Sequence, residues 1–331
     1  MRTLSLTFFI ALVFFSCSKT NEESVASGSV SFAYNGSDTV DVPINDLATG
    51  TFRSYVGGLY PNGINTPSGK YAHDLLSMCQ SVVPIDTFGQ ASASGAIVFI
   101  SLGGSTSGHL FDSLKSKTTS NPQTNPNLRL LKCSDGFGSA SLNSLINPND
   151  PYWNHVSQII WGAQSSYRQV QIVYLESDDS SVKVNFPQRP TMVKSELEEC
   201  FRNLKIQFPN IKLVYLLGRT KTFEYDTIKQ KRFNKEPAPY YFGWAVKWAI
   251  EDQINGVAGT AYKGKKPVSP LITWGWYEWG NDTPRKDGFV WTQDDTRDGL
   301  HASPAGEDTL STRFQNFLLT DPAASVWYVK H

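Results

Sequence analysis

Two short motifs contain residue types that together can carry out nucleophilic catalysis. The first is Gly103-Gly104-Ser105-Thr106, which follows an apolar run and precedes a helical pattern. Glycines allow a sharp turn, and a Ser at a helix start lies where the helix dipole stabilises an oxyanion. The second is Asp298-Gly299-Leu300-His301, in which the Asp precedes the His by three residues and can orient its ring. Together they indicate a Ser–His–Asp set for acyl transfer.

Each motif also has a purely structural interpretation. Ser is a preferred N-cap residue, so Ser105 can simply begin a helix. The segment 298–301 can be a helix-entry loop, because Ser303 and Pro304 are typical of a helix start. A phosphate-binding loop is not indicated, since both GxxxxGK[ST] and GxGxxG are absent. No pair of His has metal-ligand spacing, so we expect no metal site.

The elements that must position these motifs alternate along the chain. Short apolar runs predict strands, and periodic segments between them predict helices. Continuous apolar strands that alternate with helices indicate a three-layer α/β/α sandwich around a mainly parallel, five-stranded, flavodoxin-like sheet. The expected strands are Ala96–Leu102, Leu128–Cys133, Val170–Leu175, Ile211–Leu217 and Pro270–Trp274. The expected helices are Ser107–Ser116, Trp153–Gly162, Val193–Gln207, Phe242–Asn255 and Ala305–Leu319. Chemistry in such folds lies beyond the strands' carboxyl ends, here 103–107, 134–139, 176–180 and 218–222.

The N-terminal residues have the pattern of an export segment. Arg2 precedes an apolar run that is too short to span a bilayer comfortably, and residues 1–16 read as a signal peptide. The run ends in a sequence that resembles a bacterial lipoprotein box, with Cys17 as the lipidated residue. We therefore expect a protein that is lipid-anchored in the cell envelope, at the outer membrane, either periplasmic or surface-facing. An ordinary signal peptide cut near Ser16 is the alternative.

Residues beyond the leader divide into three parts. Residues 17–29 are polar and read as a flexible tether. Residues 30–51 predict a small β-hairpin, because two alternating segments flank Asn35-Gly36. Residues 52–331 form the main domain. We expect the lipid to be the only contact with the membrane.

Composition limits the functional classes. The chain has 331 residues, and its 30 basic and 30 acidic side chains leave no net charge. This balance argues against a nucleic-acid binder. Once Cys17 is lipidated, an odd number of cysteines remains, so not all of them can pair within the chain. Cys79 and Cys200 could form a disulfide after export.

Aromatic side chains are concentrated just ahead of the second motif, where the segment 274–280 and Trp291 contain four of the nine Trp. We expect Trp274 and Trp276 to line the site and stack on a sugar ring. Core packing is the alternative, because Trp buries a large area. Arg219 follows the fourth expected strand, where it can contact an acidic sugar or pair with Asp178.

The two motifs together resemble the SGNH (GDSL-type) hydrolase family. The segment 103–106 resembles that family's nucleophile block, although Gly104 stands where Asp is usual. The segment 298–306 resembles the family's last block, and the likeness covers roughly residues 52–322. It implies Ser105 as nucleophile, His301 as base, Asp298 as the residue that orients His301, and no cofactor.

The resemblance also implies an oxyanion hole that includes the Ser105 amide. A Gly after the second strand should contribute, for which we choose Gly138, with Gly136 second. The family then has an Asn in a Gly-x-Asn-Asp pattern, whereas this chain has Glu-Ser-Asp-Asp at 176–179. An ionised Asp cannot donate a hydrogen bond. Either Asp179 is protonated, another donor replaces it, or only backbone amides form the hole.

These features predict a serine ester hydrolase. Export and aromatic content favour an O-acylated, foremost O-acetylated, polysaccharide or oligosaccharide as its substrate. The departures at Gly104 and at Asp178-Asp179 allow a second interpretation, a glycan-binding surface lipoprotein that keeps the fold without turnover. Hydrolysis of lipid esters is less favoured, because the sequence shows no long apolar lid.

Overall fold

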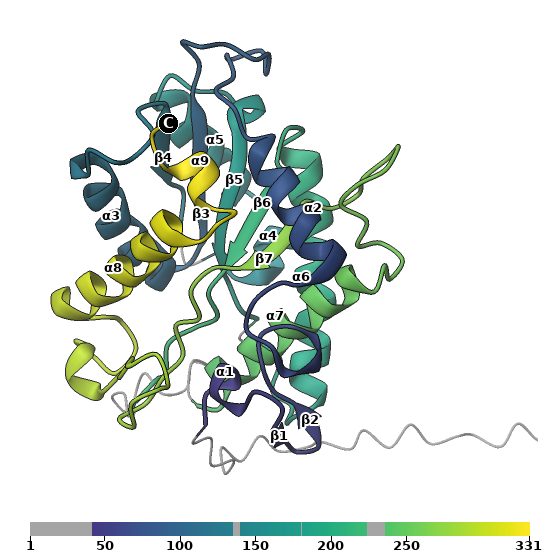
Figure 1. Cartoon of the computed structure of the whole chain (residues 1–331), viewed down its shortest axis with the longest axis vertical. Coiled ribbons are helices and arrows are strands. Elements are labelled where there is room, and N and C mark those ends of the chain that lie inside the picture. Colours follow the sequence, from purple (N-terminus) through teal and green to yellow (C-terminus); the bar gives the residue numbers. More distant parts are fainter. Residues whose placement is uncertain (1–41, 135–139, 180, 224–235) are drawn as a thin grey trace, which may run out of the picture. The chain divides into compact units, whose positions relative to one another are not determined.

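The computed structural model describes residues 42–134, 140–179, 181–223 and 236–331. All of them belong to one compact unit, residues 33–331. Its centre is a five-stranded parallel sheet in the order β4-β3-β5-β6-β7 (Figure 1). The strands are β3 (Ile97–Gly103), β4 (Leu128–Lys132), β5 (Val170–Glu176), β6 (Leu213–Leu216) and β7 (Leu271–Trp274). The predicted three-layer α/β fold is confirmed.

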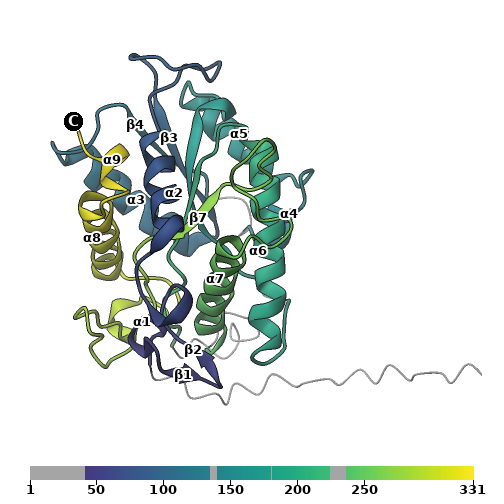
Figure 2. The ribbon, with the colours of Figure 1, turned by 45° about the vertical axis from the view of Figure 1, so that its right-hand side comes forward.

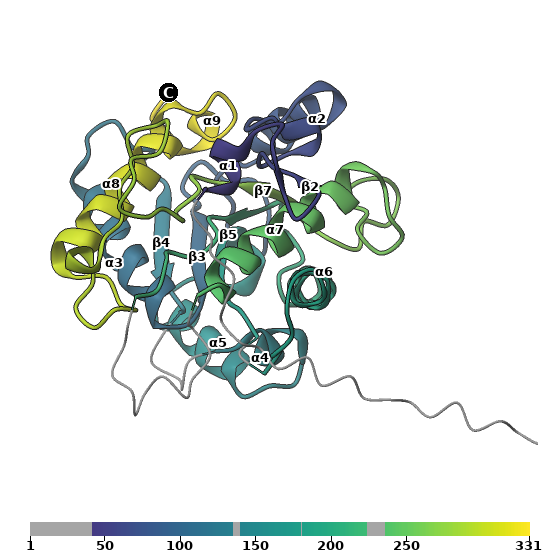
Figure 3. The same ribbon diagram turned by 90° about the horizontal axis from the view of Figure 1, so that it is seen from below.

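Helices cover both faces of this sheet, as Figure 3 shows. One face carries α2 (Gly69–Gln80), α3 (Ser105–Ser120), α8 (Pro304–Thr320) and α9 (Ser325–Tyr328). The other carries α4 (Leu142–Ile146), α5 (Tyr152–Gly162), α6 (Gln188–Gln207) and α7 (Ala238–Ile254). Because both faces are covered, every residue of β3, β5, β6 and β7 is buried. Figure 2 shows α3 and α8 on one flank and α6 and α7 on the other, and both pairs are in contact.

The order of the strands brings the ends of β3 and β5 together. In the parallel register, Gly103 at the end of β3 lies opposite Glu176 at the end of β5. The chain crosses between sheet faces around this position, since β3 lies between β4 and β5. A topological switch point of this kind is where open α/β sheets place their ligands.

Smaller elements precede and connect the sheet. A two-stranded antiparallel hairpin is present, but it is formed by β1 (Thr51–Phe52) and β2 (Tyr55–Val56), later than the predicted 30–51. Residues 30–41 lie outside the described ranges, and Ile44, which falls within the predicted hairpin, begins α1 (Ile44–Leu47). The 3-10 turns are η1 (Pro61–Gly63), η2 (Tyr167–Gln169) and η3 (Gln293–Asp295). No helix in the described ranges has the length and hydrophobicity required to cross a membrane.

Candidate active site

The turn between β3 and α3 places Ser105 at the edge of the sheet. Gly103 has φ 125°, and a Cβ there would lie 1.9 Å from the carbonyl oxygen of Glu176. Only glycine fits this position, because it combines a positive φ with close backbone approach. Gly104 is the N-cap and Ser105 the first residue of α3. The interpretation of Ser105 as a simple N-cap is therefore wrong.

The structure brings Ser105, His301 and Asp298 together. Ser105 Oγ lies 2.8 Å from His301 Nε2, and His301 Nδ1 lies 2.7 Å from Asp298 Oδ2. A carboxylate can only accept, so the proton of the ring belongs on Nδ1, and Nε2 is left to accept from the Ser105 hydroxyl. This is the geometry in which a His removes the proton of a serine nucleophile.

Asp298 is held by hydrogen bonds from backbone amides in addition to its contact with the His301 ring. Asp298 Oδ1 accepts from the amides of His301 at 2.8 Å and Leu300 at 3.0 Å. Partial burial would raise the pKa of Asp298. Hydrogen bonds from the His301 amide, the His301 ring and the Leu300 amide outweigh it and lower that pKa. Asp298 is therefore ionised near neutral pH and can accept a hydrogen bond from the His301 ring.

The loop that carries His301 is held at its base and in its middle. Thr296 and Ala302 form an antiparallel β-bridge at the base, and the amide of Phe223 donates to the carbonyl of Gly299 at 2.8 Å. Beyond the loop, Ser303 caps α8 by accepting from the amide of Gly306 at 3.2 Å. The expected helix start at 303–304 is confirmed, and it follows His301 directly.

A second histidine lies close to this set but has other partners. The ring centroid of His109 is 6.0 Å from that of His301. His109 Nδ1 lies 2.9 Å from a carboxylate oxygen of Glu307, and Arg297 contacts the same nitrogen. The structure therefore pairs Ser105 with His301 rather than with His109.

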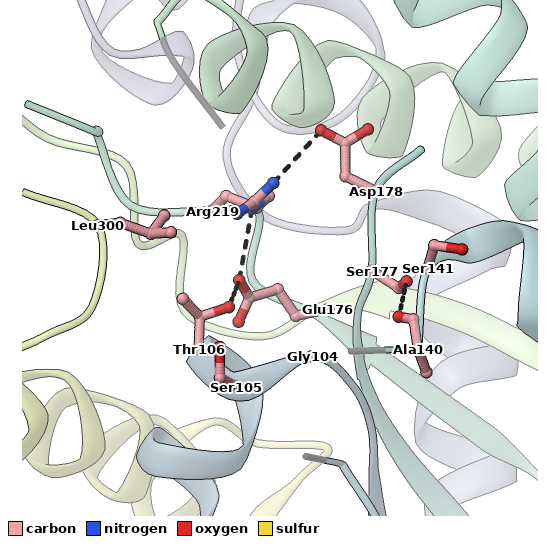
Figure 4. Close-up of a pocket in the computed structure, with 10 residues that line it drawn as sticks. All are labelled: Gly104, Ser105, Thr106, Ala140, Ser141, Glu176, Ser177, Asp178, Arg219 and Leu300. Carbon is pink, nitrogen blue, oxygen red and sulfur yellow. Dashed lines mark hydrogen bonds and ion pairs between the residues drawn. The ribbon is translucent and has the colours of Figure 1, made fainter. Parts of the chain in front are cut away.

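Ser105 opens onto a small cavity of about 110 Å³ (Figure 4). Its walls come from the ends of three parallel strands, β3, β5 and β6, from residues 140–141 ahead of α4, and from the loop of His301. The lining residues are Gly104, Ser105, Thr106, Ala140, Ser141, Glu176, Ser177, Asp178, Arg219 and Leu300. The carboxyl ends of the strands thus form the cavity, as the fold class predicts.

One wall of the cavity is a connected set of charged side chains. Glu176 accepts from Thr106 Oγ1 at 2.6 Å and from the hydroxyl of Tyr174 at 3.0 Å. Arg219 Nε lies 3.5 Å from Glu176 Oε1, and Arg219 Nη1 lies 3.4 Å from Asp178 Oδ2. Asp178 Oδ2 also pairs with Arg189 Nη2 at 2.7 Å. The expected pairing of Arg219 with Asp178 is therefore present.

Two carboxyl groups near Arg219 are desolvated. Burial raises the pKa of Glu176, while the Arg219 guanidinium and hydrogen bonds oppose this shift. Burial also raises the pKa of Glu278 well above its usual range, and the charge of Glu176 adds to the effect. Sequence reasoning did not single out Glu176 or Glu278 as site residues. The position of Glu176 at the end of β5 was the available signal.

The structure gives a different outcome for each residue predicted to form the oxyanion hole. Asp179 is buried, and its carboxylate accepts from the amide of Ser181 at 2.7 Å and from its hydroxyl at 2.8 Å. Its carboxylate accepts hydrogen bonds within its own loop and it is not among the residues that line the cavity, so the structure does not support its assignment to the hole. Gly138, and Gly136 as second choice, lie outside the described residues. Ser105 stands at the N-terminus of α3, where a helix leaves its first amides without partners in the helix.

The tryptophans expected beside the site are packed elsewhere. Trp274 is 2% exposed, and its indole donates to the carbonyl of Leu59 at 2.8 Å. Trp276 packs edge-on against Phe289 at 4.7 Å between ring centroids and lies beside Arg285. Burial rules out Trp274 as a substrate contact, so that assignment is corrected, while Trp276 is partly exposed and is not among the residues that line the cavity. Core packing accounts for Trp274, and a cation–π cluster accounts for Trp276.

The remaining candidates concern cysteines and metals. Cys79, Cys133 and Cys200 are free and buried, so the suggested Cys79–Cys200 disulfide is absent. Burial raises the pKa of the Cys79 thiol to about 12. Cys17 lies outside the described residues. Over the described ranges, no three His, Cys, Asp or Glu side chains are grouped so that they could hold a metal ion.

Comparison with known proteins gives only distant likenesses. No protein-family model matches the chain, and no curated protein matches it. The periplasmic domain of a lipopolysaccharide acetyltransferase from Salmonella ser. Paratyphi A aligns with 79% of this chain and 94% of its own, at 12% identity and TM-score 0.39. A salicylyl-acyltransferase from a tetracycline biosynthetic pathway aligns over 71% of this chain and 58% of its own, at 11% identity and TM-score 0.35.

A third solved structure is described as a GDSL-like lipase from Parabacteroides merdae. It aligns with 70% of this chain and 96% of its own, at 8% identity and TM-score 0.33. The fold and the contacts of this chain itself describe it best. It is a doubly wound, parallel α/β sheet with Ser105, His301 and Asp298 in hydrogen-bond contact at the carboxyl edge of the sheet.

Proposed function

We propose that this chain is a serine ester hydrolase of the SGNH type that removes a small acyl group, foremost acetyl, from a carbohydrate. The contact between Ser105 Oγ, His301 and Asp298 carries this proposal. Ser105 and His301 come from segments 196 residues apart in sequence. A helix cap or a loop turn does not require that pairing, whereas acyl transfer does.

The reaction follows from the hydrogen bonds. His301 Nε2 takes the proton of Ser105 as Oγ forms a bond to the acyl carbon, and the carbonyl π electrons move to the oxygen. The tetrahedral intermediate collapses, the bond to the alcohol oxygen breaks, and His301 returns its proton to that alcohol. Water, activated by the same imidazole, then releases the acyl group as a carboxylic acid and restores Ser105.

The size and polarity of the cavity support a small acyl group on a hydroxylated substrate. A cavity of about 110 Å³ has room for an acetyl group. Its lining includes the hydroxyls of Ser141 and Ser177 and the charged ends of Asp178 and Arg219. Such groups exchange hydrogen bonds with sugar hydroxyls. The aromatic content no longer supports a carbohydrate, because the nearby tryptophans pack elsewhere.

Hydrolysis of 4-nitrophenyl acetate and of acetylated xylo-oligosaccharides tests this function. We expect turnover by the wild type and its loss in Ser105→Ala. Ser113→Ala is the matched control, because this residue lies on the same helix and its hydroxyl contacts Ser311 instead. Equal rates for Ser105→Ala and the wild type would refute the assignment of the nucleophile.

One observation favours the second interpretation, a glycan-binding protein without turnover. The Asp178 carboxylate, at the position of the family's Asn, pairs with Arg189 and Arg219 and, when ionised, cannot donate to an oxyanion. Binding of oligosaccharides together with an absence of ester turnover by the wild type would establish this alternative. Turnover that depends on Ser105 would reject it.

We also propose that the mature protein is an exported lipoprotein anchored through Cys17. The basis is the sequence of the leader, with its basic start, short apolar run and terminal Ser-Cys. Mass spectrometry of the N-terminal peptide from membrane fractions tests this directly. We expect a lipid-modified Cys17 and release of Cys17→Ser from the membrane. An unmodified N-terminus cut near Ser16 would show an ordinary signal peptide instead.

A further inference from the structure

The edge of the sheet opposite Ser105 carries the most exposed hydrophobic side chains of the described residues. All five strands are parallel and therefore begin at one edge, here called the amino edge, in the upper part of Figure 1. The largest exposed fractions among large hydrophobic side chains belong to Phe88 (72%), Ile206 (71%) and Trp161 (63%). Phe88 precedes β3, and Trp161 and Ile206 lie in the last turns of α5 and α6, which lead into β5 and β6. All three therefore lie at the amino edge.

Hydrogen bonds join the segments of the amino edge to one another. Arg168 Nη1 donates to the carbonyl of Phe88 at 3.5 Å, and Asn210 Nδ2 donates to the carbonyl of Arg168 at 2.8 Å. The segments before β3, β5 and β6 are therefore in direct contact. Tyr167, beside Arg168, is a further exposed aromatic residue there. We call the exposed side chains of these segments the amino-edge patch: Phe88, Trp161, Tyr167, Arg168 and Ile206.

The segments that lead into the five strands also carry an excess of positive charge, although the whole chain is balanced at 30 basic and 30 acidic side chains. Five basic residues and one acidic residue lie in these segments, which are residues 81–96, 121–127, 163–169, 208–212 and 255–270. Arg168, Lys265 and Lys266 are exposed, whereas Lys212 and Lys263 also contact neighbouring groups. The segment after α8 adds one basic and one acidic side chain and leaves this excess unchanged.

We propose that the amino-edge patch docks onto the surface of a membrane that contains anionic lipids. Trp and Tyr rings prefer the boundary between lipid and water, because one end of each is apolar and the other is polar. Lys and Arg side chains are attracted to anionic headgroups. The charge here is carried mainly by Lys, which is depleted in protein–protein interfaces, so the composition favours a lipid surface over a protein partner. This proposal goes beyond ester hydrolysis and does not depend on it.

Docking by this patch orients the cavity away from the membrane, because Ser105 lies at the carboxyl edge of the sheet. A lipid on Cys17 would not fix this orientation. The Val42 carbonyl accepts from the hydroxyl of Tyr240, near the start of α7 and thus towards the carboxyl edge. The 24 residues between Cys17 and Val42 reach about 80 Å when fully extended, so the tether permits either edge to face the lipid. The patch therefore selects one orientation.

Flotation with lipid vesicles tests the proposal, using phosphatidylcholine vesicles with and without about 30% phosphatidylglycerol. The protein is the chain from residue 17 with Cys17→Ser, so that neither the leader nor a lipid contributes, and the compact unit from residue 33 onwards is kept. We expect binding to the anionic vesicles to be about tenfold stronger or more than to the neutral ones. Binding should fall as salt rises from about 50 to 500 mM, because salt screens the headgroup charge.

Substitutions in the patch locate the contact. Phe88→Ser and Trp161→Ser should each weaken binding about tenfold, which is what partial burial of an aromatic ring contributes. Met192→Ser is the matched control, because Met192 is next in exposure but lies near the start of α6, towards the carboxyl edge. Of the nine Trp, all of which the structure describes, Trp161 alone has a largely exposed ring. Brominated phosphatidylcholine should therefore quench the fluorescence of the wild type but not that of Trp161→Phe.

Three results would overturn the membrane role of the patch. They are no binding to the anionic vesicles, equal binding to both kinds of vesicle, or binding that Phe88→Ser and Trp161→Ser leave unchanged. If either variant loses the wild-type melting temperature, the double charge reversal Lys265→Glu with Lys266→Glu decides, since it should weaken binding to anionic vesicles only. A dimer that these Ser variants abolish, together with no vesicle binding, would assign the patch to a second copy of the chain. Ester turnover is measured separately, so each proposal can fail alone.

Discussion

Asp298→Asn tests how the His301 ring is controlled. In the wild type, Asp298 Oδ2 accepts from His301 Nδ1 at 2.7 Å, and Oδ1 accepts from the amides of Leu300 and His301. The Asn oxygen can keep the two amide contacts, which leaves its NH₂ group facing Nδ1. That nitrogen must then accept, the ring proton moves to Nε2, and Nε2 can no longer take a proton from Ser105.

The size of the effect follows from this change of tautomer. Loss of the correct tautomer in a Ser–His–Asp set costs up to about 10⁴ in kcat, which corresponds to about 5.5 kcal/mol in the activation barrier. The fold should be affected little, because both amide contacts survive and the Asp298 side chain is 31% exposed. We therefore expect a large loss of rate with a melting temperature close to that of the wild type.

Turnover of the chromogenic ester 4-nitrophenyl acetate, measured at saturating substrate, compares the wild type with Asp298→Asn and Asp294→Asn. Asp294 is the matched control, because it lies in the same segment, is exposed and carries the same charge. We expect Asp294→Asn to retain the wild-type rate. An Asp298→Asn enzyme with more than about a tenth of the wild-type kcat would refute the tautomer argument.

Three further substitutions test the fold that positions the site. Gly103→Ala should unfold the protein or prevent soluble expression, because its Cβ would lie 1.9 Å from a backbone oxygen. Gly162→Ala is the control and should be tolerated, because a Cβ there would have no atom within 4 Å. Equal yields of folded protein from the two variants would contradict this prediction. Burial raises the pKa of Glu236 from 4.5 to about 7, so the free energy of unfolding should fall as pH rises through that window. Glu236→Gln should remove this contribution to the pH dependence and raise the free energy of unfolding above that window by up to about 3 kcal/mol. Urea unfolding at a series of pH values measures this. Identical pH profiles of the free energy of unfolding for wild type and variant would exclude it. Ser303→Ala should lower the free energy of unfolding by about 1 kcal/mol, because the Gly306 amide loses its cap; an unchanged urea midpoint would show that the cap contributes nothing.

Much of the fold could be predicted because the strands are buried on both faces. Each of the five apolar runs became a strand, and each of the five periodic segments became a helix within a few residues at its ends. The helix α2 was missed, although its buried residues Tyr71, Leu75 and Cys79 are spaced four apart. Gly69 at its start, with φ 54°, weakens the helical pattern at the boundary.

The site was predictable where residue type and position at a strand end coincide. Ser105 meets this condition at the end of β3, whereas Asp298 and His301 lie in the loop before α8 and were indicated by their spacing. The structure brings the three together. Trp274 also follows this rule, but its ring is directed into the core, and sequence does not show which way a side chain at a strand end points. The hydrogen bond from Thr106 to Glu176 depends on the register of β3 against β5, so no local sequence pattern indicates it.

Labelling with diisopropyl fluorophosphate tests the central claim most directly. A serine activated by His301 displaces fluoride and keeps the phosphoryl group, and peptide mass spectrometry then locates it. We expect one adduct, on the peptide that contains Ser105, in the wild type and in Ser113→Ala, and none in Ser105→Ala. An adduct on another residue, or equal labelling of Ser105→Ala, would contradict the assignment of Ser105 as the nucleophile.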